Sequence, residues 1–260
     1  MEKNDKNLRD RKRIHRYSTN RYHWFSWLFD QMNIPKNSMI LEQGCGNGLL
    51  WEMNQERISS DWELILSDIS PGIVKTTQYK LSQISKPIEF QVIDASKIPF
   101  TEKSFDVVIA NHMLYYMNDL EQVLKDIKRV LNLEGILYAS TIGKDHFREL
   151  KALLLEFEPR IDFSPEKVSE NFGLENGKEI LSDYFRKVNL SIYEDSLIVP
   201  EINSIVAYVL STEGNSGDEI RSILSGKRLK HFYHYLETKL SKHGTITISK
   251  ASGMFEATGY

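Results

Sequence analysis

Short apolar segments alternate with helical segments through the first half of the chain, and this alternation restricts the fold more than any other feature. The apolar segments that predict strands are Met39–Glu42, Glu63–Ser67, Ile88–Ile93, Phe105–Ala110 and Ile136–Ile142. Consecutive apolar residues in the fourth segment are typical of a strand buried on both faces of a parallel sheet. Apolar positions at helical spacing predict a helix over residues 119–132, which Gly135 would stop. This order predicts a doubly wound α/β fold with right-handed crossovers.

The second half of the chain is less regular and predicts helices around one late strand. The expected elements are helices over residues 144–185 with a break near 159–165, a turn at 173–177, a strand over Val188–Val199, a helix from Pro200 through Leu210, a Gly-rich link over 213–218, one long helix from Glu219 to about His243, and a final strand over Thr245–Ser249.

Bulk composition excludes several classes of protein. The formal net charge is −3, so no strong overall field attracts nucleic acid or an anionic membrane. The basic run Arg9–Arg16 is expected to be a solvated terminal segment. Cys45 is the single cysteine, which fits a reducing compartment, and no apolar stretch reaches the ~20 residues of a membrane span. The first thirty residues lack the apolar core of a signal peptide, so we expect a cytoplasmic location.

A glycine-rich turn, EQGCGNG at residues 42–48, follows the first strand directly. Its glycines allow a sharp turn and close approach of a ligand to the backbone, and the amides of the next helix can meet polar ligand groups. The dinucleotide fingerprint G-x-G-x-x-G would need glycine where this chain has Leu49, which argues against a nicotinamide dehydrogenase.

Asp68 ends the second predicted strand. A carboxylate at that edge can accept both ribose hydroxyls of a nucleotide, although a lone aspartate there can also cap a helix. The glycine turn at the appropriate distance upstream favours the ribose role.

Together these features resemble class I S-adenosylmethionine (SAM)-dependent methyltransferases, in particular the small-molecule branch with a ubiquinone/menaquinone methyltransferase-like core. The resemblance extends over about residues 39–142 and adds the segments Ile93-Asp94-Ala95 and Asn111–Tyr116. It implies a Rossmann-like, mostly parallel seven-stranded sheet with helical insertions that form a cap. The cofactor-binding residues that it implies are Glu42, Gly44, Cys45, Gly46, Gly48, Asp68, Ile69, Asp94, Ala95, Asn111 and Tyr17.

Few residues stand out as catalytic or metal-binding. His112 is the candidate general base, because histidine titrates near neutrality and this one follows the fourth strand; the alternative is that it only shapes the pocket. Tyr17 and its aromatic neighbours could close over the sulfonium as a lid or could pack on the domain. His231 and His234 could share a helix face, but no carboxylate or cysteine at matching spacing supports a metal site, so no metal is expected.

The resemblance implies four regions and one reaction. The regions are an N-terminal lid at residues 1–34, a SAM-binding core at 35–143, an acceptor-site cap at 144–243 and a final core strand at 244–260. The expected reaction is in-line transfer of a methyl group from SAM to a small molecule, leaving S-adenosylhomocysteine. The alternatives are an RNA or protein methyltransferase, disfavoured by the acidic net charge, and a non-catalytic SAM-binding regulator.

Overall fold

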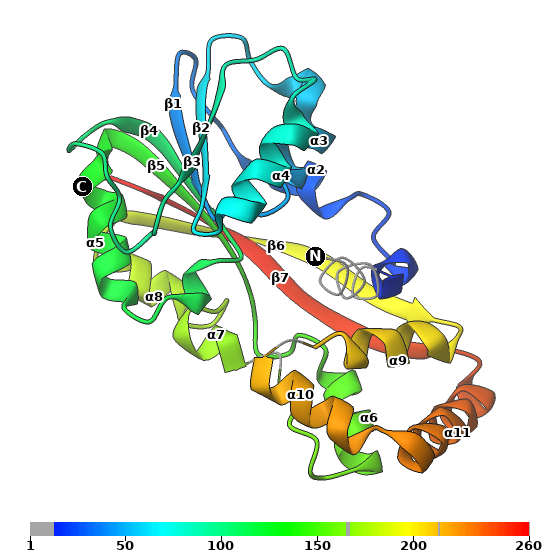
Figure 1. Cartoon of the computed structure of the whole chain (residues 1–260). Coiled ribbons are helices and arrows are strands. Elements are labelled where there is room, and N and C mark those ends of the chain that lie inside the picture. Colours follow the sequence, from blue (N-terminus) through cyan, green and yellow to red (C-terminus); the bar gives the residue numbers. More distant parts are fainter. Residues whose placement is uncertain (1–12, 165–166, 213, 260) are drawn as a thin grey trace. The chain divides into compact units, whose positions relative to one another are not determined.

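The computed structural model describes residues 13–164, 167–212 and 214–259, which form two compact units (Figure 1). The first unit comprises Met1–Arg21, Asp145–Glu166 and Glu194–Ala251, and the second comprises Tyr22–Lys144, Lys167–Tyr193 and Ser252–Tyr260. Residues 9–12 of the basic run lie outside the described residues.

A seven-stranded sheet forms the framework of the protein, as the sequence predicts. Its strands are β1 (Met39–Gln43), β2 (Glu63–Asp68), β3 (Ile88–Val92), β4 (Phe105–Asn111), β5 (Leu131–Ile142), β6 (Lys187–Val199) and β7 (Ile246–Thr258). Their order is β3-β2-β1-β4-β5-β7-β6. The first five strands pair in parallel, and β7 runs antiparallel to β5. The doubly wound, mostly parallel fold is therefore confirmed.

The helices of the second unit are α2 (Trp24–Gln31), α3 (Leu49–Met53), α4 (Pro71–Leu81), α5 (Leu120–Val130), α7 (Lys167–Asn171) and α8 (Gly177–Ser182), with 3-10 turns η2 (Gln55–Arg57) and η3 (Leu114–Tyr116). Local chemistry explains where the two longest begin. Ser70 Oγ accepts a hydrogen bond from Ile73 N at the start of α4, and Asp119 caps α5 through Gln122 N.

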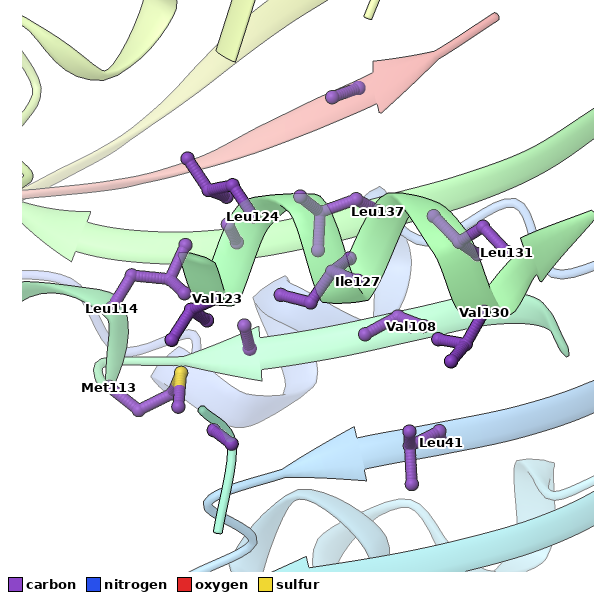
Figure 2. Close-up of a cluster of buried hydrophobic side chains, with 14 of the residues drawn as sticks. Leu41, Val108, Met113, Leu114, Val123, Leu124, Ile127, Val130, Leu131 and Leu137 are labelled. Atoms are coloured by element: carbon purple, nitrogen blue, oxygen red, sulfur yellow. The ribbon is translucent and has the colours of Figure 1, made fainter. Parts of the chain in front are cut away.

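One apolar face of α5 covers the sheet. Figure 2 shows Val123, Ile127 and Val130 on this helix, with Val108 of β4 and Leu41 of β1 on the strands beneath them. These side chains are buried, and they belong to a cluster that also includes residues of α8. The helical spacing of the apolar residues over 119–132 thus marks the face that packs on the sheet.

The opposite face of the sheet has its own core. Leu28 of α2, Trp51 of α3 and Ile40 of β1 belong to one buried cluster there. The hydroxyl of Tyr138 on β5 accepts a hydrogen bond from Asn33 N at 2.9 Å and so connects the end of α2 to the sheet. Helices on both faces explain why β1 and β4 are apolar at successive positions.

The first unit is mainly helical. Its elements are the 3-10 turn η1 (Ile14–Tyr17) and the helices α6 (Arg148–Phe157), α9 (Ile202–Leu210), α10 (Gly214–Ile223) and α11 (Gly226–His243), joined by the adjoining parts of β6 and β7. Its core includes Phe147, Leu154, Ile205 and Phe232.

Asp195 connects the N-terminal segment of this unit to the end of β6. One carboxylate oxygen accepts hydrogen bonds from Ser18 Oγ at 2.6 Å and Asn20 N at 3.1 Å, and the other pairs with Lys250. The Asp195 side chain is fully buried. Residues 18–20 are therefore held beside β6 by hydrogen bonds to the carboxylate of a buried ion pair, as well as by the bridge between Ser18 and Leu197.

Four expectations about element bounds are wrong. The helix expected over 219–243 is two helices, α10 and α11, separated near Gly226, whose φ of 53° does not fit a right-handed helix. The Gly-rich link expected before it is already helical from Gly214. The final strand continues to Thr258 because its second half pairs with β5, and α5 ends at Val130, so Gly135 lies within β5.

The unit boundaries also differ from the four regions drawn from the sequence, since residues 22–34 and 167–193 belong to the same unit as the glycine turn. In the described part of the chain no helix has the length and apolar character needed to cross a membrane.

Candidate functional site

The carboxyl ends of β1, β2, β3 and β4 lie at one edge of the sheet, because these strands are parallel. Gln43 at the end of β1 is level with Ser67 of β2 on one side and with Ala110 of β4 on the other. The strand order reverses between β1 and β4, and open α/β sheets bind ligands at such a switch point. Most of the residues predicted to bind the cofactor follow these strand ends.

The glycine turn after β1 leaves space at its centre. Gly44, Gly46 and Gly48 all have positive φ, at 70°, 53° and 69°. A Cβ added to Gly46 would meet no atom within 4 Å, so this position is open. The Gly46 amide donates to Asp68 Oδ2 at 3.2 Å. The middle of the turn is thus fixed by the end of β2 and remains accessible to a ligand.

Gly48 has a different role, which is to let the turn pack closely against a helix. A Cβ there would lie 2.7 Å from Thr77 Cγ2 and 3.0 Å from Leu81 Cδ1, both on α4. Glycine at this position allows the turn to pack directly against α4. Its predicted contact with the cofactor stays a prediction.

Glu42 is almost completely buried beneath the turn, with 2% of its surface exposed. Trp51 Nε1 donates to Glu42 Oε2 at 2.6 Å, and Asn111 Nδ2 donates to Oε1 at 3.2 Å. Burial raises the pKa of Glu42 to about 7, although both hydrogen bonds favour its charged form. A cation bound next to Glu42 would favour the ionised carboxylate.

Asp68 lies at the same edge and is 9% exposed. Its Oδ1 accepts from Ser70 N at 2.9 Å, and its Oδ2 accepts from Gly46 N. Each carboxylate oxygen can accept more than one hydrogen bond, so this arrangement leaves acceptor capacity for ribose hydroxyls. Ile69 beside it is 67% exposed, which offers an apolar face next to that carboxylate.

Asp94 and Ala95 follow β3. The exposed Asp94 carboxylate accepts from Ser96 N at 2.9 Å and from Ser96 Oγ at 2.7 Å, and these hydrogen bonds lower its pKa. Ala95 is buried.

The loop that carries these two residues is attached to α5. Arg129 donates to the carbonyls of Ile98 at 2.9 Å and Phe100 at 2.6 Å, while Asp126 accepts from Ile98 N at 2.6 Å. The two side chains also pair with each other across 2.7 Å.

His112 has an unusual backbone for a residue with a side chain, since its φ is 49°. Its amide donates to both the carbonyl and the hydroxyl of Ser140, each at 3.1 Å. Its ring packs against Trp24 with 5.2 Å between centroids and against Tyr115 with 6.1 Å. Strained residues cluster at functional sites, so this geometry supports a functional His112, whose role as base stays a prediction.

Three other residues predicted to bind the cofactor, Asn111, Cys45 and Tyr17, lie in different environments. Asn111 holds Glu42 with its amide nitrogen, while its Oδ1 is buried and has no hydrogen-bond partner among the described residues. Cys45 is buried in the turn, and burial raises the pKa of its thiol, so it is not poised as a nucleophile. Tyr17 belongs to the first unit, where its hydroxyl donates to Glu201 at 3.1 Å, and its lid role stays a prediction.

The residues at this edge fit the adenosyl sulfonium that the resemblance implies. The open position at Gly46 accommodates close approach, the exposed Ile69 offers an apolar surface, and the unpartnered Asn111 Oδ1 offers an acceptor. Within the described residues, no group of three His, Cys, Asp or Glu side chains could hold a metal ion.

Sequence reasoning did not identify Trp51 or Thr77 as part of this site. Both lie on helices that follow a predicted ligand-binding strand end, and both reach back to it: Trp51 to Glu42 and Thr77 to the Gly46 carbonyl. Their positions just after the glycine turn and after Asp68 were the available signal, but neither residue type is diagnostic.

Comparison with known proteins agrees with this geometry. Residues 41–139 match a family model described as a methyltransferase domain. A malonyl-[acyl-carrier protein] O-methyltransferase of Methylovorus sp. is 32% identical over 118 residues, which cover 44% of this chain and 40% of that protein. The mitochondrial arginine-hydroxylase NDUFAF5 of Homo sapiens is 30% identical over 137 residues, covering 51% of this chain and 38% of that protein.

Among solved structures, a Haemonchus contortus phosphoethanolamine N-methyltransferase complexed with S-adenosylhomocysteine superposes with a TM-score of 0.56 at 14% identity. The alignment covers 97% of this chain and 56% of that one.

Residues 41–139 thus form a methyltransferase domain, as the sequence predicts, and the solved structure shares its fold. The chain covers only about two fifths of the length of the two curated relatives.

Proposed function

We propose that this protein transfers the methyl group of SAM to a small-molecule acceptor. The observation that carries the proposal is a pair of buried carboxylates next to the open position at Gly46: Glu42 just before the glycine turn, and Asp68, which accepts from the Gly46 amide. A sulfonium nucleoside carries a ribose diol and an α-ammonium group, and carboxylates recognise both groups well.

Each residue at the sheet edge then has one role. Asp68 accepts from the ribose hydroxyls, and Ile69 covers one face of the adenine. Asp94 and the backbone of Ala95 meet the adenine edge, and Glu42, held by Trp51 and Asn111, faces the ammonium group. SAM supplies a methyl group that is already activated on sulfur, so the chain has to orient the acceptor and exclude water.

His112 is the proposed base for an oxygen or nitrogen acceptor. Its backbone is held by Ser140 and its ring by Trp24, so the imidazole has a defined orientation. The acceptor cap at residues 144–243, rich in aromatic side chains, is likewise part of the proposal.

The relatives suggest which acceptors to test first. A thioester-linked carboxylate such as malonyl-[acyl-carrier protein] follows from the Methylovorus protein, and a peptide arginine is a useful contrast because the human relative is described as an arginine hydroxylase.

Calorimetry tests the cofactor half of the proposal. The wild-type protein is expected to bind S-adenosylhomocysteine but not NAD, and Asp68→Ala is expected to weaken binding by about tenfold or more, equivalent to ~1.4 kcal/mol. Asp68→Asn separates loss of charge from loss of the side chain. Asp183→Ala, at an exposed carboxylate after α8, is the control and should bind like wild type. Unchanged affinity in Asp68→Ala would refute the site.

Turnover tests the catalytic half. Transfer of radiolabelled methyl to small molecules, or to the malonyl group that acyl-carrier protein carries, supports the proposal. Label found only in RNA or on the amino-acid side chains of proteins favours the alternative methyltransferase classes. Cofactor binding without transfer to any class of acceptor would indicate a regulatory protein.

A further inference from the structure

Thr77 on α4 holds the centre of the glycine turn. Its side chain is completely buried, and its hydroxyl donates to the Gly46 carbonyl at 2.5 Å. The same glycine donates its amide to Asp68, so both polar groups of Gly46 have partners. A residue at the middle of an otherwise open turn is therefore fixed from two sides.

These contacts form a closed ring. Asp68 accepts from Gly46 N through Oδ2 and from Ser70 N through Oδ1. Ser70 caps α4, and α4 carries Thr77 back to the Gly46 carbonyl. Asp68, the residue proposed to bind the ribose, is thus held at a fixed distance from the glycine turn. That distance is set by the segment of α4 between Ser70 and Thr77, which is less than two helical turns long.

The hydrogen bond from Thr77 also fixes a second group. A peptide unit is planar and trans, so its N–H points opposite to its C=O. Because the Gly46 carbonyl points at α4, the amide of Asn47 points away from α4. Among the described residues no backbone carbonyl accepts a hydrogen bond from the Asn47 amide. The next carbonyl, that of Asn47, accepts from Lys80 Nζ at 3.2 Å, so α4 holds the turn at two successive peptides.

We propose that Thr77 is a positioning residue that aims the Asn47 amide at the amino-acid part of the cofactor. This inference depends on the proposed function. Thr77 does not touch the ligand. Its hydroxyl keeps the peptide between Gly46 and Asn47 in one orientation. The Asn47 N–H is therefore in place before the ligand binds, so binding loses less conformational entropy.

The neighbouring Thr76 provides a matched control. Its hydroxyl also donates to a backbone carbonyl, that of Gly72 at 2.9 Å, but this bond lies within α4 and is exposed. Thr76→Val and Thr77→Val therefore make the same chemical change on adjacent positions of one helix, and only Thr77→Val affects the turn. Thr77→Ser keeps the hydroxyl and should restore the contact.

Two ligands separate a positioning role from a general structural one. S-Adenosylhomocysteine has the amino-acid part, whereas 5′-methylthioadenosine has the same adenosine and thioether without it. For Thr77→Val, calorimetry is expected to show about tenfold weaker binding of S-adenosylhomocysteine and nearly unchanged binding of 5′-methylthioadenosine. Thr76→Val and Thr77→Ser should match wild type with both ligands. Circular dichroism confirms that each variant is folded, and Thr77→Ala replaces Thr77→Val if the latter does not fold.

Equal weakening of both ligands would overturn the positioning role, because a loosened turn would affect the adenosine as well. Unchanged binding of both ligands would overturn it too. If the wild-type protein bound neither ligand, the proposed function itself would fail, and the inference with it.

Discussion

Trp51 donates its indole N–H to the Glu42 carboxylate, with 2.6 Å between Nε1 and Oε2, and both side chains are buried. Trp51→Phe removes this donor and leaves a buried carboxylate with one partner fewer. Hydrogen bonds to charged groups contribute roughly 1.5–3 kcal/mol, so above about pH 7, where Glu42 is ionised, we expect a loss of about 2 kcal/mol or more in the free energy of unfolding, measured with urea.

Trp62→Phe is the control for this prediction. Trp62 is also buried and donates its indole N–H to the Pro35 carbonyl at 2.8 Å, which is a neutral acceptor. The loss of volume is the same in both variants, so a smaller effect of Trp62→Phe isolates the charge on the acceptor. Equal losses from the two variants would contradict a special role for the contact between Trp51 and Glu42.

Glu42 makes stability depend on pH in an unusual direction. Burial raises its pKa from 4.5 to about 7, so below pH 4.5 the carboxyl is protonated in both the folded and the unfolded chain. Between about pH 4.5 and 7 the unfolded chain releases this proton and the folded chain keeps it. The free energy of unfolding therefore falls as pH rises through this window, by on the order of 3 kcal/mol in total, and this component is constant at higher pH.

Glu42→Gln should remove this component. We expect the difference in unfolding free energy between wild type and Glu42→Gln to change over about pH 4.5 to 7 and to be constant above. A difference that does not vary with pH would show that Glu42 keeps an ordinary pKa.

Ligand affinity should show the complementary trend. A bound ammonium group favours ionised Glu42, so the affinity of wild type for S-adenosylhomocysteine is expected to rise as pH increases through about 7. Calorimetry at several pH values measures this trend, and in Glu42→Gln it should be absent.

The sequence predicts which strand ends come together better than it predicts the side-chain contacts that hold these ends in place. Parallel strands bring their carboxyl ends to one edge by geometry, so the nearness of Glu42 and Asp68 follows once the βα alternation is recognised. The contacts of Trp51 and Thr77 depend instead on how two helices pack back on that edge. Pattern alone does not specify such packing, because a buried Trp or Thr is ordinary in any core.

The predicted bounds of helices and strands are wrong where tertiary structure determines where an element ends. The middle of β7, Ser249–Gly253, is polar or small and looks like an end to the strand, yet residues 252–258 pair with β5 along its carboxyl half. The helix expected from Glu219 breaks at Gly226, although apolar residues continue beyond it at helical spacing. In both places the local pattern competes with tertiary structure, and tertiary structure decides the outcome.

Asp195 provides a prediction for the first unit. Burial alone would raise its pKa, but the hydrogen bonds from Lys250 and Ser18 outweigh burial and lower it. Asp195→Ala leaves Lys250 in a mostly buried place without this carboxylate, and breaking such a pair costs about 3–5 kcal/mol of unfolding free energy. The contribution should be present above the unfolded pKa and lost as pH falls through the folded one.

Asp218→Ala is the control for Asp195→Ala, since Asp218 pairs with Arg221 at the surface and its side chain is 80% exposed. Differential scanning calorimetry should show a large fall in melting temperature for Asp195→Ala and little change for Asp218→Ala. Similar melting temperatures for both variants would mean that the buried pair does not stabilise the unit.

Arg129 holds the loop after β3 through the carbonyls of Ile98 and Phe100. Arg129→Gln removes charge-assisted hydrogen bonds that are only partly exposed, so we expect the free energy of unfolding to fall by roughly 1–3 kcal/mol. Because this loop carries Asp94, the affinity for adenosine ligands should also fall, measured by calorimetry. Lys125→Gln on the same helix removes an exposed pair with Glu121 and should change neither quantity appreciably. If both variants behaved alike, the loop would owe its conformation to the buried Ile98 side chain and not to Arg129.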